Sequence, residues 1–409
     1  MATWPVKRMD ELCEITSSKR IFAADYVSEG VPFYRGREIT EKYKGNLDVS
    51  TELFITEEKF REIDRKFGAP RQGDLLLTSV GTLGSVYVVK PSDRFYFKDG
   101  NLTWFRNFKG LNSQFLYYWI GSPQGKAELK KCTIGSSQSA FTIVLLKGIE
   151  IELPPPAVQQ RIADILSAYD ELIENSQRRI KTLESMVRAL YREWFVHFRF
   201  PGHESIPRIT SSLGEIPQGW EVRKLGNLAE EMRRNVRKGK LEEEQPYVGL
   251  EHIPRRSLTL DAWEETNELG SNKLEFKKGE ILFGKIRPYF HKVSIAPFDG
   301  LCSADTIVIR ARQLEYYAIV VSCVSSDEFV AHATATSNGS KMPRANWHVL
   351  EEYPVVIPTV EVARQFSAVI EPSIRQMQAL VFQTINLRRT RDLLLPRLLS
   401  GQINVDPSA

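Results

Sequence analysis

A strict seven-residue repeat dominates one long stretch of the chain, from Pro154 to Phe195. Apolar or small side chains return at alternating steps of four and three residues, which keeps one seam of an α-helix facing one partner helix. The prolines at 154–156 suit the start of such a helix, because proline is tolerated in a first turn and not in the interior. A helix from Ala157 to Phe195 would be about 55–60 Å long, at roughly 1.5 Å per residue. The predicted seam comprises Ile162, Leu166, Tyr169, Ile173, Ile180, Leu183, Val187 and Leu190.

A helix with so narrow an apolar seam needs a partner, and a second stretch near the C-terminus supplies one. Pro154 aligns with Pro358, an offset of 204 residues (358 − 154). The same offset carries the first seam onto apolar positions at Phe366, Ile370, Met377, Leu380, Leu387, Leu394 and Leu398. Polar residues also stand at seam positions, among them Ser176, Thr384 and Arg391. Such residues often set the register of a helix pair, and chance substitution is the alternative. The alternative is two unrelated amphipathic helices, each packed on its own globular domain.

Length and composition set the class of protein. The 409 residues are too many for one ordinary core, so two or more domains are expected. A hydrophobic content of 42% and a charged content of 26% are typical of a soluble globular protein, with no run long enough to span a membrane and no signal peptide at the start. The four cysteines are far apart and form no C-x-x-C pair, which argues against a zinc site and favours a cytoplasmic location. A net charge of +4 permits a nucleic-acid partner without demanding one.

The first part of the chain is predicted to be one mixed domain. Strand-like patterns flank the turn in RQGDLLLTSVGTLGSVYVV, and NLTWFRNF indicates another strand. LFITEEKF and SQFLYYWIGS indicate helices, and CTIGSSQSAFT a loop of small polar residues. Residues 201–218 are rich in Pro, Gly and Ser, which predicts a linker.

The second half of the chain then repeats the first. GWEVRKLGNLAEEMRR follows the pattern of TWPVKRMDELCEITSS, QPYVGLEHI that of VPFYRGREI, and KKGEILFGKIRPYF that of RQGDLLLTSVGTLG. A period near 200 residues indicates duplicated domains and not a solenoid. The expected segments are two globular domains, 1–153 and 219–356, two long helices, 154–200 and 357–401, the linker at 201–218, and a tail at 402–409.

These motifs resemble the specificity (S) subunit of type I restriction–modification systems. The resemblance rests on GDLLLTSVGTLGSV and GEILFGKIRPYF, on the two polar loops, and on LPPPAVQQRIADIL with IPTVEVARQFSAVI. Each motif alone is weak, but their order, repeated twice, covers essentially the whole chain. One departure is that the first copy begins at Trp4 without the Gly-Glu-Ile-Pro that precedes the second.

The resemblance implies an α+β fold. It comprises two similar globular α/β target-recognition domains, each followed by a long helix, and the two helices pair as an antiparallel coiled coil. It also implies a non-catalytic subunit whose partners are double-stranded DNA, two methyltransferase subunits and restriction subunits, without a membrane. S-adenosylmethionine, ATP and Mg would be bound by those partner subunits, and no cofactor by this chain. Two readers held about 50 Å apart would meet DNA about one and a half turns apart, since one turn is about 34 Å.

Candidate DNA-binding residues follow from the chemistry of phosphate and base contacts, which need Arg, Lys, small hydroxyls, amides and backbone donors. In the first domain these are Arg35, Arg37, Thr78, Ser79, Thr82, Ser136, Ser137, Gln138 and Ser139. In the second they are Lys285, Arg287, Tyr289, Ser337, Asn338, Ser340, Lys341 and Arg344. The alternative for each is a solvated charge or an ordinary turn. The same alternatives apply to the charged run at 233–240.

Enzymatic functions find little support. The chain lacks the Asn/Asp-Pro-Pro-aromatic loop of a DNA methyltransferase, and GSPQGKA is one residue short of a P-loop. The six histidines show no metal-ligand spacing. The alternatives are a stand-alone DNA-modifying enzyme, a coiled-coil scaffold that binds only proteins, and the reader of a related methylation-only system.

Overall fold

The structure, a computed structural model, describes residues 4–46, 49–135 and 139–405. The chain divides into two compact units. Unit 1 comprises Met1–Glu174 with Leu387–Ala409, and unit 2 comprises Asn175–Asn386.

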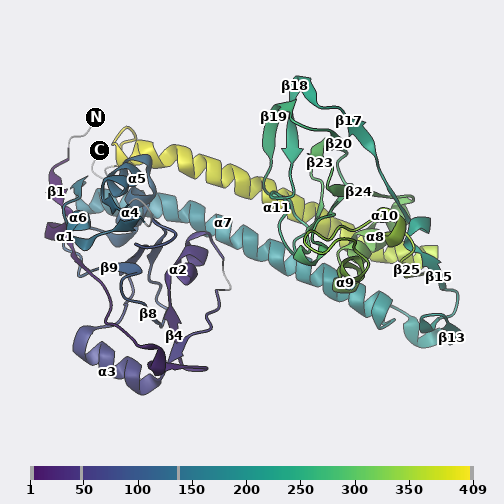
Figure 1. Cartoon of the computed structure of the whole chain (residues 1–409), viewed down its shortest axis with the longest axis horizontal. Coiled ribbons are helices and arrows are strands. Elements are labelled where there is room, and N and C mark those ends of the chain that lie inside the picture. The colour runs from purple at the N-terminus through teal and green to yellow at the C-terminus, as the bar shows by residue number, and fades with distance from the viewer. Residues whose placement is uncertain (1–3, 47–48, 136–138, 406–409) are drawn as a thin grey trace. The chain divides into compact units, whose positions relative to one another are not determined.

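Two long helices, drawn in teal and yellow in Figure 1, contribute to both units. They are α7 (Pro156–Tyr191) and α11 (Val360–Leu399). Unit 1 contains the start of α7 and the end of α11, whereas unit 2 contains the end of α7 and the start of α11. Within the described residues, no helix combines the length and apolar character needed to cross a membrane.

A four-stranded antiparallel sheet with the order β2-β9-β6-β7 forms the centre of unit 1. Its strands are β2 (Glu14–Thr16), β6 (Leu75–Thr78), β7 (Val86–Val88) and β9 (Leu102–Arg106). Every residue of β6 is buried, because apolar clusters cover both faces of the sheet. Leu75 and Leu77 belong to one cluster and Leu76 to the other, as the two-residue period of a strand requires.

A second, smaller sheet of unit 1 has the order β3-β5-β4-β8. Its strands are β3 (Tyr26–Val27), β4 (Val31–Tyr34), β5 (Phe54–Ile55) and β8 (Tyr96–Phe97), and β4 runs parallel to β8. The short helices η1 (Ala23–Asp25), α2 (Gly36–Tyr43) and α3 (Glu57–Phe67) accompany it. The helix predicted in LFITEEKF is α3, which begins after β5, where the Thr56 hydroxyl accepts a hydrogen bond from Lys59 N.

The remaining elements of unit 1 join the sheet to the long helices. The strand β1 (Val6–Arg8) pairs antiparallel with β12 (Glu150–Glu152), the strand that leads into α7. The helices are α1 (Met9–Leu12), α4 (Ser113–Gly121), α5 (Pro123–Lys131) and α6 (Ile143–Lys147). The hairpin of β10 (Thr133–Ile134) and β11 (Ala140–Phe141) lies in the predicted polar loop.

Unit 2 repeats this arrangement, as predicted. Its central sheet, β16-β24-β21-β22, comprises β16 (Ala229–Glu231), β21 (Ile281–Gly284), β22 (Val293–Ile295) and β24 (Thr306–Ala311). Ile281 and Phe283 join one apolar cluster and Leu282 the other, like their counterparts in β6. The strand β15 (Glu221–Lys224) pairs with β25 (Pro354–Ile357) as β1 does with β12. The helices are η4 (Leu225–Asn227), η5 (Pro288–Phe290), η6 (Leu314–Tyr316), α8 (Tyr317–Val324), α9 (Asp327–Ala335) and α10 (Trp347–Leu350).

The outer sheet is where the two units differ most. In unit 2 it has five strands in the order β17-β20-β23-β18-β19. They are β17 (Arg234–Val236), β18 (Gly239–Val248), β19 (Glu264–Leu269), β20 (Lys273–Phe276) and β23 (Gly300–Ser303). Three strands correspond, β19-β18-β23 here and β5-β4-β8 in unit 1, each with one antiparallel and one parallel pair. The shared central sheet thus carries two different outer sheets.

The two long helices run antiparallel in each unit. In unit 1, Ile162 and Leu166 near the start of α7 share a core with Leu398 at the end of α11. In unit 2, Val187 near the end of α7 shares a core with Phe366 near the start of α11. The predicted antiparallel pairing is therefore confirmed within both units.

The segment 201–218 differs from the predicted linker. It contains a short helix, η3 (His203–Ser205), and a hairpin of β13 (Arg208–Ser211) and β14 (Gly214–Pro217). Ile216 is buried, and the Phe200 ring stacks on Trp220 with 4.8 Å between centroids. The Pro, Gly and Ser residues therefore make turns within an ordered segment that packs on the core of unit 2. The preceding helix α7 ends at Tyr191 and continues as one π-helical turn, Arg192–Val196.

Candidate nucleic-acid interface

Three of the segments predicted to bind DNA meet in unit 1. The loop after β6 pairs with the polar loop through a β-bridge between Val80 and Ala140. Phe141 N also donates a hydrogen bond to Ser79 O at 3.0 Å. Gly36, at the start of α2, lies against the same strand end, since a Cβ there would be 3.8 Å from Thr78 Cγ2. The fold thus gathers segments that are far apart in sequence.

Arg35 and Arg37 flank this meeting point at the first turn of α2. The Arg35 backbone N–H donates to Glu38 Oε2 at 2.8 Å, and its guanidinium pairs with Glu38 Oε1 at 3.2 Å. Arg37 is exposed. A helix N-terminus presents unsatisfied N–H groups, so an exposed arginine beside it suits a phosphate.

Thr78 and Ser79 do not lie where the prediction placed them. Both are buried at the end of β6. Thr78 Oγ1 accepts a hydrogen bond from Ser85 N at 2.9 Å, and Ser79 Oγ shares one with Thr103 Oγ1 at 2.7 Å. Their hydroxyls therefore hold the base of the loop and are unavailable to DNA. Thr82 at the loop tip and Ser139 are exposed, whereas Ser136, Ser137 and Gln138 lie outside the described residues.

Unit 2 builds an equivalent loop pair after β21. Ile286 forms a β-bridge with Arg344, as Val80 does with Ala140 in unit 1. Arg287 N donates to Pro343 O at 2.8 Å, and Ala345 N donates to Lys285 O at 3.0 Å. The second polar loop is closed by a further bridge between Asn338 and Arg344. The same pair of loops therefore meets in both units.

Several predicted residues of unit 2 have partners within the chain. Lys285 Nζ is 3.6 Å from Glu231 Oε1, and Arg344 Nη2 is 3.4 Å from Asp305 Oδ1. Ser337 Oγ donates to a carbonyl oxygen of α9 at 2.7 Å. These groups must exchange partners before they contact a ligand. Four others are exposed: Tyr289, Asn338, Ser340 and Lys341.

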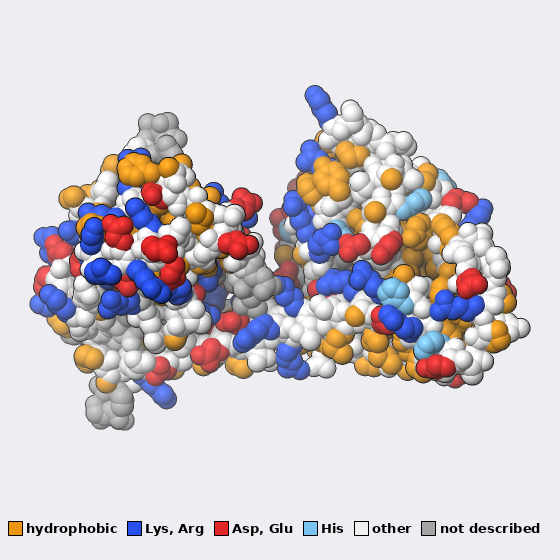
Figure 2. All heavy atoms as spheres, turned by 90° about the horizontal axis from the view of Figure 1, so that it is seen from below, with side chains coloured by type: hydrophobic (Ala, Val, Ile, Leu, Met, Phe, Trp, Pro, Cys, Tyr) orange, Lys and Arg blue, Asp and Glu red, His pale blue; other side chains and the backbone are white. Residues whose placement is uncertain are grey.

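Charge around these loops is mixed. Figure 2 shows Lys and Arg side chains spread over the drawn face of both units, with Asp and Glu among them. In the predicted charged run, Arg233 pairs with Glu231 at 2.8 Å and Arg234 with Glu280 at 2.6 Å. Burial lowers the pKa of His291, so this ring in the second loop is neutral at neutral pH. Whether a Lys or Arg side chain can contact DNA therefore depends more on its ion pairs within the chain than on its residue type.

Arg255 lies beside the loop after β21 but was not among the DNA-binding residues predicted from the sequence. Its guanidinium lies 4.0 Å from the centroid of the Phe290 ring, and the Tyr289 ring packs edge-on against the same ring at 4.8 Å. Arg256 N donates to His291 O at 2.8 Å, which ties this segment to the loop after β21. The only sequence signal was the basic pair in PRRS, which is also typical of a solvated turn.

The predicted coiled-coil positions face the helix pair or the adjoining cores. Buried are Ile162, Leu166, Ile173, Val187, Phe366, Ile370, Met377, Leu380 and Leu398, and half-buried are Tyr169, Ile180, Leu183, Leu190, Leu387 and Leu394. The polar seam residue Arg391 forms an ion pair with Asp170 of α7, whose other oxygen accepts a hydrogen bond from Tyr118 OH at 2.6 Å.

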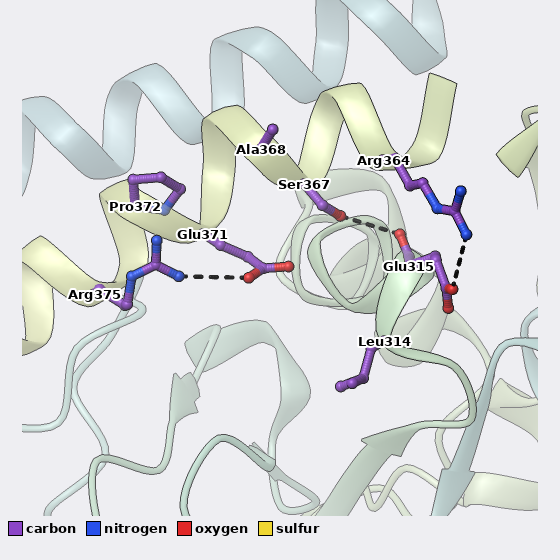
Figure 3. Close-up of a pocket in the computed structure, with 8 residues that line it drawn as sticks. All are labelled: Leu314, Glu315, Arg364, Ser367, Ala368, Glu371, Pro372 and Arg375. Atoms are coloured by element: carbon purple, nitrogen blue, oxygen red, sulfur yellow. Dashed lines mark hydrogen bonds and ion pairs between the residues drawn. The ribbon is translucent and has the colours of Figure 1, made fainter. Parts of the chain in front are cut away.

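A surface pocket lies along α11 in unit 2 (Figure 3). Its charged groups are paired with one another: Arg364 Nη2 with Glu315 Oε1, and Arg375 Nη1 with Glu371 Oε2, each at 3.5 Å. The Leu314 side chain at its edge is 83% exposed.

No group of three His, Cys, Asp or Glu side chains arranged to hold a metal occurs in the part of the chain that the structure describes. Burial raises the pKa of the Cys302 and Cys323 thiols to about 12.

Comparison with known proteins agrees with this architecture. The model of the family described as "Type I restriction modification DNA specificity domain" matches residues 1–185. The type I restriction enzyme MjaIX specificity subunit of Methanocaldococcus jannaschii is 26% identical over 420 residues, which cover 98% of this chain and 94% of that protein. The EcoDI specificity subunit of Escherichia coli is 24% identical over 275 residues, or 61% of this chain and 60% of that protein.

A solved structure shares the fold. The crystal structure of the type I restriction–modification S subunit from M. genitalium aligns with a TM-score of 0.61 and 16% identity, covering 97% of this chain and 96% of that one. Residues 1–185 are thus similar to the type I DNA specificity domain. Over nearly its whole length, the chain is related to type I specificity subunits.

Proposed function

We propose that this chain is the DNA sequence-specificity subunit of a type I restriction–modification complex, and that it recognises a bipartite, asymmetric DNA site. One observation carries the proposal. The same loop pair is built twice, through the bridges Val80–Ala140 and Ile286–Arg344, on two copies of one central sheet. Two copies of one reader fit a target with two halves.

The side chains on the two loop pairs differ, which supports unlike half-sites. In unit 1 the exposed groups are a guanidinium on Arg37 and the hydroxyls of Thr82 and Ser139. In unit 2 they are the Tyr289 ring, the Asn338 amide, the Ser340 hydroxyl and the Lys341 ammonium group. Base edges in the major groove are distinguished by their donors and acceptors, so different side chains select different bases.

The long helices act as the scaffold for the partner subunits. Both helices carry exposed apolar side chains, among them Met186 and Val369, at 49% and 47% exposure. Exposed apolar groups are typical of surfaces that other proteins cover. Two methyltransferase subunits bind there, and restriction subunits join them in the cytoplasm. This chain itself is non-catalytic, and S-adenosylmethionine, ATP and Mg act in those partners.

Methylation mapping tests the proposal. The chain is expressed with its cognate methyltransferase subunit in cells without other methylation, and the modified genomic positions are sequenced. We expect a split motif with two unlike halves and a constant gap. A continuous motif, or the same methylation without this chain, would contradict the proposal. Mapping with and without the restriction subunits distinguishes a methylation-only system.

A further inference from the structure

Arg287 occupies a backbone position that unit 1 fills with glycine. Gly81 and Arg287 are 206 residues apart (287 − 81), the offset that also relates Gly73 to Gly279 (279 − 73). Both lie in the left-handed region, with φ of 81° at Gly81 and 51° at Arg287. Glycine adopts this conformation freely, whereas a residue with a Cβ does so at a cost in folding free energy. Unit 2 therefore places a long cationic side chain at a position whose backbone conformation favours glycine.

The backbone at Arg287 is held firmly. Arg287 N donates to Pro343 O at 2.8 Å, and its neighbour Ile286 bridges to Arg344. Pro288 follows directly, and its ring restricts the chain on the other side. The loop pair thus fixes the direction in which the side chain leaves the backbone, as a base-reading residue requires.

The guanidinium is held only weakly. Its nearest partners are the Lys341 carbonyl oxygen, 3.5 Å from Nη2, and the Phe290 ring, with 5.9 Å between the guanidinium carbon and the ring centroid. Arg287 Nε has no hydrogen-bond partner. Because Nε is buried, the terminal nitrogens of the fork are the donors that a ligand would meet.

Carboxylates pair with three neighbouring cations but not with this one. Lys285 faces Glu231, Arg344 faces Asp305, and Arg256 faces Asp327 at 2.7 Å. Within the described residues, no carboxylate lies at ion-pair distance from Arg287. Its positive charge is thus available to an external acceptor, and no internal ion pair must first be broken.

We propose that Arg287 reads a guanine through the major groove in the half-site bound by unit 2. The proposal rests on the proposed function and names the base and the residue within it. A guanidinium fork donates two parallel hydrogen bonds to guanine O6 and N7, the commonest specific contact of arginine with DNA. Backbone strain retained at a fixed, half-buried position is typical of a functional side chain. Gly81 carries no such group, so the equivalent loop of unit 1 reads no base through this position.

The test is the methylation map of the full chain carrying Arg287→Gly, expressed with its cognate methyltransferase subunit. We expect one G·C position in one half of the motif to lose at least tenfold of its preference over other bases. The other half and the gap should not change. The thermal unfolding midpoint should be no lower than that of the unmodified chain, because glycine relieves the left-handed strain at this position.

Arg256→Gly is the matched control. Arg256 also lies in the left-handed region, with φ of 56°, but its guanidinium is paired with Asp327. The substitution should leave the motif unchanged. Arg287→Lys keeps the positive charge, Arg287→Gln removes it, and neither has the guanidinium fork. Comparing the two variants therefore separates guanine recognition by the fork from general attraction of positive charge to DNA.

Three results would overturn the role of Arg287: an unchanged preference in Arg287→Gly, the absence of any fixed G·C pair from one half of the wild-type motif, or uniformly weaker methylation in all three variants without a change of preference. A wild-type motif that is not split would instead overturn the proposed function. The two failures are therefore distinguishable.

Discussion

Glu184 is a buried carboxylate at the side of α7 that faces the body of unit 2. Its Oε1 accepts hydrogen bonds from Ser257 Oγ at 2.6 Å and from Leu258 N at 2.7 Å. Burial raises the pKa of Glu184, and these hydrogen bonds offset the effect only in part. The protonated form is therefore favoured in the folded chain relative to the unfolded one.

Glu184→Gln should relieve this cost. The amide oxygen can accept the same two hydrogen bonds without a buried charge. Because the folded pKa is raised, the wild type should lose stability relative to the variant as pH rises from the unfolded value, about 4.3, through the folded one. Urea unfolding at a series of pH values measures this difference.

Glu14→Gln is the control of opposite sign. The hydrogen bond from Arg106 lowers the pKa of Glu14, so its carboxylate stabilises the fold above the unfolded pKa, and this stabilisation is lost as pH falls. A Glu184→Gln variant that becomes less stable than the wild type as pH rises would contradict the assignment.

Single residues were the hardest level to predict from the sequence. The turn predicted at 72–74, before β6, is confirmed, but Thr78 and Ser79, predicted to contact DNA, are buried at the end of this strand. A hydroxyl at a strand end can either contact DNA or hydrogen-bond the loop that follows the strand. Which of these it does depends on whether other parts of the chain cover that end of the sheet, which the sequence does not show. The cations of the second loop posed the same problem, because their partners Glu231 and Asp305 are distant in sequence.

At the scale of the elements, the helix pair is fastened by one polar cluster in unit 1. Arg391 of α11 pairs with Asp170 of α7, and Tyr118 OH donates to the same carboxylate at 2.6 Å. The Arg391 and Asp170 side chains are 28% and 30% exposed, which places the pair between a surface and a buried ion pair. This contact supports the interpretation of Arg391 as a residue that sets the helix register.

Arg391→Ala should therefore destabilise unit 1 by about 1–3 kcal/mol, because it leaves Asp170 partly buried without its cation. Asp170→Ala should cost a similar amount, and the double variant should cost less than the sum of the two. Denaturant unfolding of the three variants measures the coupling. Arg389→Ala, two residues earlier on an exposed face, should change stability by no more than about 0.5 kcal/mol. Additive single effects would show that the pair does not set the register.

Elements with strong periodicity could be predicted, and those without it could not. The seven-residue repeat indicated the helix pair because its period follows directly from helix geometry. The hairpin within 201–218 was missed because Pro, Gly and Ser favour turns in ordered and mobile segments alike. The five-stranded outer sheet of unit 2 was missed because β18 and β19 are charged and largely exposed, without the alternation of a half-buried strand.

At the scale of the whole molecule, duplication determines the organisation. Both units share the central sheet order, the strand pair that precedes each long helix, and the bridged loop pair. The outer sheets and the residues on the loops differ. The sequence showed the duplication because paired motifs recur in the same order, although no motif is specific by itself. The two units thus combine a common frame with different residues on the loops, as the proposed reading of two unlike half-sites requires.

The most direct test of two independent readers on one scaffold is an exchange of residues 201–356 for the matching segment of a related chain. Methylation is then mapped with the same methyltransferase subunit. One half of the motif should change to that of the donor, while the other half and the gap length stay as before. A change in both halves, or in neither, would contradict the division of sequence reading between the two units.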